Sequence, residues 1–76
     1  MKQLTQYILE KITRHPNDVS IQEEKEDQKI NLSVSLNEED VPKVIGKEGK
    51  VIRSIRNIVK TSARKKDLWV NLTIDA

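Results

Sequence analysis

The chain carries two hydrophobic patterns, one typical of strands and the other typical of helices. Hydrophobic residues occupy every second position in residues 19–21, 30–36 and 68–74, which is the period of a strand with one buried face. They recur every three or four positions in residues 2–14 and 50–64, which is the period of an amphipathic helix. The pattern therefore predicts three strands and two long helices.

Turn residues set the ends of these elements. Residues 15–18, with the sequence HPND, end the first helix because proline cannot continue its hydrogen-bond ladder. The strand that begins at Val19 is expected to run into an acidic turn over residues 24–28. Asp40 is a good helix N-cap and Pro42 suits a first helical turn, so a short helix ending at Gly46 is predicted. The order of elements is α-β-β-α-α-β, in a single domain covering residues 1–76.

The predicted helix from Lys50 to Arg64 has two different faces. Its apolar face should cover the sheet and contains Ile52, Ile55, Ile58, Val59 and Ala63. At ~100° per residue, its basic side chains share a neighbouring arc of roughly 120°; they are Lys50, Arg53, Arg56, Lys60 and Arg64.

Charge is distributed unevenly along the chain, although the net charge is only +2. Residues 1–40 contain five basic and nine acidic side chains, for a net charge of −4. Residues 41–66 contain nine basic side chains against Glu48 alone, for +8, and residues 67–76 add −2. A basic segment of this density on a small domain favours a polyanionic partner.

The composition excludes several classes of protein and of binding site. The 76 residues include no cysteine, which excludes disulfides and thiolate metal sites. No stretch approaches the ~20 apolar residues of a membrane span, and Glu10 and Lys11 interrupt the N-terminus too early for a secretory signal. We therefore expect a cytoplasmic protein without a cofactor, metal or small-molecule substrate. A core of this size is marginal alone, so self-association is expected.

The most informative local motif is GKEG at residues 46–49. Two glycines three residues apart allow a sharp turn that presents backbone amides to an anion, and the N-terminus of the following helix favours negative charge. Basic side chains surround this turn, at Lys43, Lys47, Lys50 and Arg53. A phosphate-binding P-loop is excluded, because Val44 and Val51 stand where that motif requires Gly and Ser or Thr.

The motif VIGKEGKVI at residues 44–52 resembles the I-G-x-x-G signature of KH domains, and α-β-β-α-α-β is the order of type II KH domains. Over essentially all 76 residues the chain resembles the KhpA family of small bacterial proteins with one KH domain. The resemblance implies an α+β fold, in which a three-stranded sheet is covered on one face by three helices.

The same resemblance implies an RNA-binding protein that clamps the backbone of about four single-stranded nucleotides with its GxxG loop. By position, Gly46, Lys47, Glu48 and Gly49 would form the clamp and Ile45 would lie at the base of the groove, while Lys43, Lys50 and Arg53 flank it. The family also implies a role in post-transcriptional regulation or as an RNA chaperone, and a homodimer or a larger KH-domain partner. Glu48 departs from a phosphate-binding loop, and we expect its side chain to point outward.

Two other functions remain open at this point. A protein-interaction adaptor would use the KH surface for protein partners. Its candidate partner residues are Trp69 on the exposed side of the last strand and Arg56 and Lys60 on the helix over residues 50–64. A helix-turn-helix DNA-binding module also joins two helices by a tight turn, although its first helix is usually longer. An enzyme is not expected, because no nucleophile–base pair or metal-ligand cluster occurs.

Overall fold

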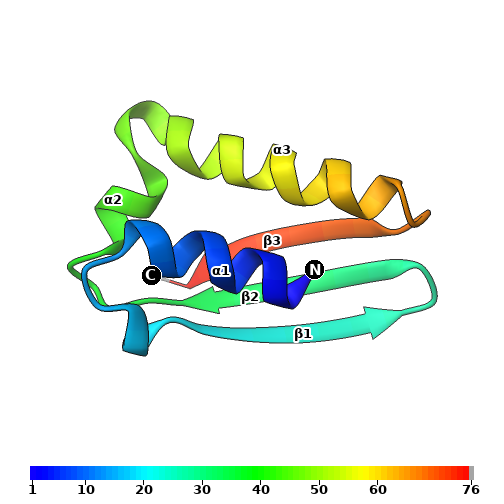
Figure 1. Ribbon diagram of the computed structural model, residues 1–76, viewed down its shortest axis with the longest axis horizontal. Coiled ribbons are helices and arrows are strands. Elements are labelled where there is room, and N and C mark those ends of the chain that lie inside the picture. Colours follow the sequence, from blue (N-terminus) through cyan, green and yellow to red (C-terminus); the bar gives the residue numbers. More distant parts are fainter. Residues whose placement is uncertain (76) are drawn as a thin grey trace.

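The computed structural model describes residues 1–75 and has the predicted order of elements (Figure 1). The helices are α1 (Lys2–Ile12), α2 (Val41–Ile45) and α3 (Lys50–Arg64), and the strands are β1 (Ser20–Glu26), β2 (Lys29–Ser35) and β3 (Trp69–Asp75). Two single 3-10 turns, η1 (Pro16–Asp18) and η2 (Lys47–Gly49), fall in the connections.

The three strands form one sheet in the order β1-β2-β3. β1 and β2 are antiparallel and joined by a tight turn, with Glu26 opposite Lys29, while β2 and β3 are parallel, with Ile30 opposite Val70. A parallel pair needs a long crossover, and α2 and α3 supply it. β3 is therefore an edge strand that runs back beside α3 (Figure 1).

The core lies between one face of the sheet and the helices. Ile30, Leu32 and Val34 of β2 are buried while the residues between them are at least partly exposed, so the helices cover one face only. From the helices, Leu9 of α1, Val44 of α2 and Val59 of α3 are almost fully buried against that face. The structure thus confirms the predicted α+β fold, with α1 and α3 over the sheet and α2 at one end (Figure 1).

Two predicted boundaries at the N-terminal half are wrong. α1 ends at Ile12 rather than at residue 14, because Thr13 is extended and the next two N–H groups bond elsewhere. The predicted acidic turn over residues 24–28 is mostly strand. Only Asp27 and Gln28 form the turn, since the ladder of β1 continues to Glu26 and Asp27 takes the left-handed conformation.

The C-terminal half needs two further corrections. Ile58 was predicted on the buried face of α3 but is 50% exposed, because it lies some 120° from Ile52 around the helix, beyond the reach of the sheet. β3 begins at Trp69, whose N–H bonds to the Gln28 carbonyl, so Leu68 lies just outside the strand.

Candidate nucleic-acid interface

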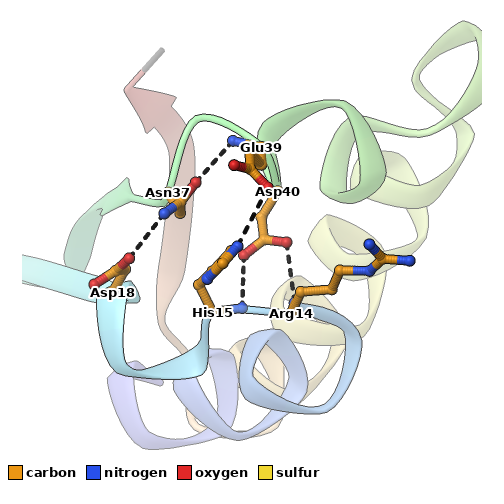
Figure 2. A network of polar contacts seen from close by, with 6 residues as sticks. All are labelled: Arg14, His15, Asp18, Asn37, Glu39 and Asp40. Carbon is orange, nitrogen blue, oxygen red and sulfur yellow. Dashed lines mark hydrogen bonds and ion pairs between the residues drawn. The ribbon is translucent and has the colours of Figure 1, made fainter.

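Asp40 anchors the start of α2 to the end of α1 (Figure 2). Its carboxylate oxygens accept hydrogen bonds from the backbone N–H groups of Arg14 and His15, each at 3.0 Å, and its side chain is only 1% exposed. Asp40 is the N-cap residue of α2 as predicted, but its carboxylate makes no capping bond to that helix. It joins two segments 25 residues apart instead. This contact positions α2 and the GxxG loop that follows it.

Neighbouring side chains extend the Asp40 contact into a small network (Figure 2). The Asn37 amide donates to Asp18 Oδ2 at 2.9 Å and its carbonyl oxygen accepts from the Glu39 N–H, while His15 Nε2 lies 3.4 Å from Glu39 Oε2. His15 therefore has a structural place at the helix end, as the sequence indicated. Burial by itself raises the pKa of the Asp40 carboxyl, but the two N–H donors and the positive charges of His15 and Lys43 hold this pKa below its ordinary value.

We predict that replacing Asp40 with Asn lowers the Tm by several degrees at pH 7, because an amide offers one acceptor oxygen to two N–H donors. A lowered folded-state pKa means that the carboxylate stabilises the fold fully above the unfolded pKa of 3.8, and that this contribution is lost as pH falls further. The wild type should therefore lose more Tm between pH 7 and pH 3 than Asp40→Asn does. Thermal unfolding followed by circular dichroism measures both, with the exposed Asp75→Asn as control. Equal acid sensitivity of wild type and Asp40→Asn would contradict this role.

The GxxG loop needs glycine at its two ends for different reasons. Gly46 (φ 76°) and Gly49 (φ 73°) both have positive φ, which favours glycine. A Cβ on Gly46 would also overlap the Val51 side chain, lying 2.8 Å from its Cβ, and would lie 3.0 Å from its backbone N. A Cβ on Gly49 would meet nothing within 4 Å. The backbone at Gly46 is therefore packed directly on the first turn of α3, whereas Gly49 faces open space.

Glu48 and Arg53 determine the shape of the loop between the glycines. Glu48 is left-handed at φ 57°, a conformation that costs about 1–2 kcal/mol for a residue with a Cβ. The Arg53 guanidinium lies against this turn: its Nη2 donates to the Glu48 carbonyl at 2.9 Å and its Nε to the Gly49 carbonyl at 3.3 Å. Arg53 thus holds the loop as well as bringing charge to it, a role that its position in the sequence did not reveal.

The remaining basic residues near the loop are free to meet an anion. The side chains of Lys43, Lys47 and Lys50 are exposed, and within residues 1–75 none of their ammonium groups has a hydrogen-bond or ion-pair partner. Over the same residues the one ion pair joins His15 and Glu39, so no carboxylate neutralises any basic side chain of the segment 41–66. Ile45, 36% exposed, ends α2 beside the loop. The structure therefore brings all eight predicted RNA-contact residues to one end of the α2–α3 pair.

The basic arc of α3 runs beside the free edge of β3. Arg56 Nε donates to the Leu72 carbonyl at 3.1 Å and so caps one of the groups that edge strand leaves unpaired. Further along α3, the Arg64 guanidinium lies 5.6 Å from the centre of the Trp69 ring, which is 63% exposed. Trp69 is thus exposed as predicted, with a partner on α3 that the alternation of β3 did not indicate.

The opposite side of α3 exposes apolar residues instead of basic ones. Val51 is 37% and Ile58 50% exposed, and at ~100° per residue they lie within roughly 20° of each other on the helix. α3 thus presents a basic side toward β3 and an apolar side away from it.

Residues 1–75 contain no group of three His, Cys, Asp or Glu side chains that could hold a metal ion. None of the helices in that range is both long enough and apolar enough to cross a membrane.

An antiparallel β1–β2 pair, a parallel β3 and a GxxG loop between α2 and α3 define a KH domain of type II topology. The family model "KhpA/KhpB, KH domain" matches residues 2–74. Similar proteins named RNA-binding protein KhpA occur in Halalkalibacterium halodurans (32% identical over 97% of both chains) and in Clostridium perfringens (36% identical over 97% of this chain and 99% of the relative). A third, from Thermotoga maritima, is 43% identical over 74% of this chain and 75% of its own.

The chain therefore belongs to the KhpA family of KH domains. This is the family that the chain resembles in its GKEG motif and its order of elements. The family is non-enzymatic, in agreement with a sequence that offers no nucleophile–base pair.

Proposed function

We propose that this chain binds single-stranded RNA by clamping its backbone at the GxxG loop, as a cytoplasmic protein of post-transcriptional regulation or RNA chaperoning. The observation that carries the proposal is the basic surface, without ion-pair partners, around a loop whose backbone is open at Gly49. Lys47 and Lys50 would meet phosphates directly, while Arg53 holds the loop and adds its charge. The relatives named as RNA-binding proteins support the same choice of ligand.

Backbone clamping predicts a strong dependence of affinity on salt. Each phosphate neutralised on a single strand contributes a slope of about −0.7 to the plot of log affinity against log salt concentration. Lys47, Lys50 and Arg53 suggest two to four such contacts, and Lys47→Ala should flatten the slope by up to roughly 0.7 for all RNA sequences alike. Fluorescence anisotropy of labelled oligouridine at several salt concentrations measures the slope. A salt-independent affinity of the intact protein would rule out the clamp.

The structure argues against the DNA-binding alternative. α2 has five residues, which is too short for the first helix of a helix-turn-helix, and α3 packs along β3 rather than standing free of the domain. Competition between single-stranded RNA and duplex DNA of equal length tests this alternative, and we expect the protein to bind the RNA with higher affinity.

We also propose that the chain pairs with a second copy or with a larger KH-domain protein, through the apolar side of α3. Val51 and Ile58 are exposed there. Because the core of this chain is small, association would add to its stability. Pairing would place two weak clamps on one RNA and raise affinity through effective concentration. The chain would then bind both RNA and protein, with the protein partner on the side of α3 that faces away from the basic arc.

Sedimentation tests the pairing. At micromolar concentration the mass should be about twice that of the 8.8 kDa chain, and Ile58→Glu should return it to one chain, because a buried carboxylate opposes the interface. Asn57→Glu, the exposed neighbour on α3, is the control and should leave the dimer intact. A single-chain mass at high concentration, with no KH-domain protein co-purifying from cells, would contradict the proposal.

A further inference from the structure

Trp69 stands at the end of the basic arc of α3 that is farthest from the GxxG loop. A hollow between α3 and the start of β3 is lined by Lys60, Arg64, Leu68, Trp69 and Val70. Its walls combine two cations, two aliphatic side chains and one indole, and it contains no carboxylate. Such a combination is typical of sites where nucleic-acid bases stack on an aromatic ring while cations meet the backbone.

The indole itself is available for stacking. The ring is 63% exposed although Arg64 lies over it at 5.6 Å, so the cation covers one face and leaves the rest of the ring open. A guanidinium beside the ring adds a second planar cation that a nucleobase can stack on. Trp69 is also at the edge of the sheet, where β3 has no neighbouring strand to hinder access.

The basic arc connects this hollow to the loop. From Gly49 to Arg64 the helix rises about 22 Å, at ~1.5 Å per residue. Arg53 lies at the loop end of that distance, and Arg56 and Lys60 follow it on the side of α3 that faces β3. At about 3.4 Å per nucleotide, the distance corresponds to about six nucleotides of a stacked strand. An RNA held at the loop therefore has a continuous positive path to Trp69.

Acidic residues indicate which side of the indole the strand would use. On the hairpin side of Trp69, one hollow is lined by Glu26 and Asp27 with Lys29, and another by Asp67 with Arg64. A further hollow has Lys29 as its one cation. The hollow lined by Lys60 and Arg64 has two cations and no carboxylate, so it attracts a phosphate more strongly than the others. The charge around the ring thus favours entry from α3.

We propose that Trp69, with Arg64 and Lys60, forms a second RNA subsite, in which a base of the strand leaving the GxxG loop stacks on the indole. The subsite rests on the proposed RNA-binding function and extends it from about four nucleotides to about ten. It compensates for a chain that has only two aromatic residues, Tyr7 and Trp69.

The test uses labelled oligouridines of 4 and 12 nucleotides, the wild type, Trp69→Ala and Trp69→Phe. Trp69 is the sole tryptophan, so its fluorescence reports stacking directly, and we expect quenching by the 12-mer but not by the 4-mer. Trp69→Ala should weaken binding of the 12-mer about 10-fold, within the range for loss of one base–aromatic stack, and Trp69→Phe should keep most of the affinity. Both variants should bind the 4-mer like the wild type, since the loop is unchanged.

The outcomes separate the two proposals. Failure of both oligomers to bind the wild type would overturn the RNA-binding function itself. Binding of the 12-mer without quenching, or with equal affinity in Trp69→Ala, would overturn the subsite and leave the clamp standing. A Trp69→Ala protein with unchanged RNA affinity and a lower sedimentation mass would assign this surface to a protein partner instead.

Discussion

Replacing Lys47 and Glu48 together with Asp is expected to abolish RNA binding while the fold stays intact. Both side chains are exposed at the tip of the loop, so neither contributes to the core. Lys47→Asp reverses a charge where a phosphate would lie, and at contact distances charge interactions are strongest. Glu48→Asp keeps its charge and suits the left-handed backbone there, because Asp tolerates positive φ better than most residues. In a gel-shift assay the band of the protein–RNA complex should disappear, while the circular dichroism spectrum should remain that of the wild type.

The matched control is Lys2→Asp with Glu10→Asp, on α1. It makes the same two changes of residue type, and an acid at the first turn of a helix is compatible with the helix dipole. Because the net charge falls equally in both double variants, loss of binding in the loop variant alone identifies a local contact. If a folded loop variant still bound RNA, the GxxG loop would have no part in the mechanism.

Gly46→Ala is expected to impair RNA binding and stability far more than Gly49→Ala. Both substitutions place a Cβ on a backbone with positive φ. The cost is about 1–2 kcal/mol at Gly49, which is left-handed, and about 1–3 kcal/mol at Gly46, whose ψ of 175° lies in a region almost exclusive to glycine. At Gly46 the added carbon must also displace Val51 and the start of α3, which moves the loop away from the shape that Arg53 holds. At Gly49 the added carbon enters open space. Denaturant unfolding and RNA anisotropy on the same two proteins measure both effects.

The two alanine variants share the change of residue type and the sign of φ, and they differ in the Val51 contact and in ψ, which is 175° at Gly46 and 16° at Gly49. Glu48→Gly provides the converse, because it should relieve strain and raise stability. Equal losses at both glycines would show that neither the Val51 contact nor the more restrictive backbone of Gly46 adds to the cost of a positive φ.

Hydrophobic periodicity was sufficient to predict the strands and the two long helices, whereas their arrangement as a KH fold came from the family resemblance. The alternation in residues 30–36 and 68–74 and the repeats in 2–14 and 50–64 each correspond to an observed element. Local signals decided these elements, so a single sequence could reveal them. The errors fall where a distant partner overrides the local signal: Asp40 takes the N–H groups that would have continued α1, and pairing with β2 extends β1 through an acidic stretch.

Some features of the candidate interface could also be predicted from the sequence, and others could not. The sequence by itself determined the GxxG motif, the concentration of charge in residues 41–66 and the membership of the family, because each depends on residue type and spacing. Only the tertiary structure decided that Arg53 closes the loop, that Gly46 packs on Val51 and that Arg64 reaches Trp69. These contacts depend on how a loop folds back on a helix and how α3 lies against β3. Such distances are set by packing of the whole domain, and no local pattern of residues records them.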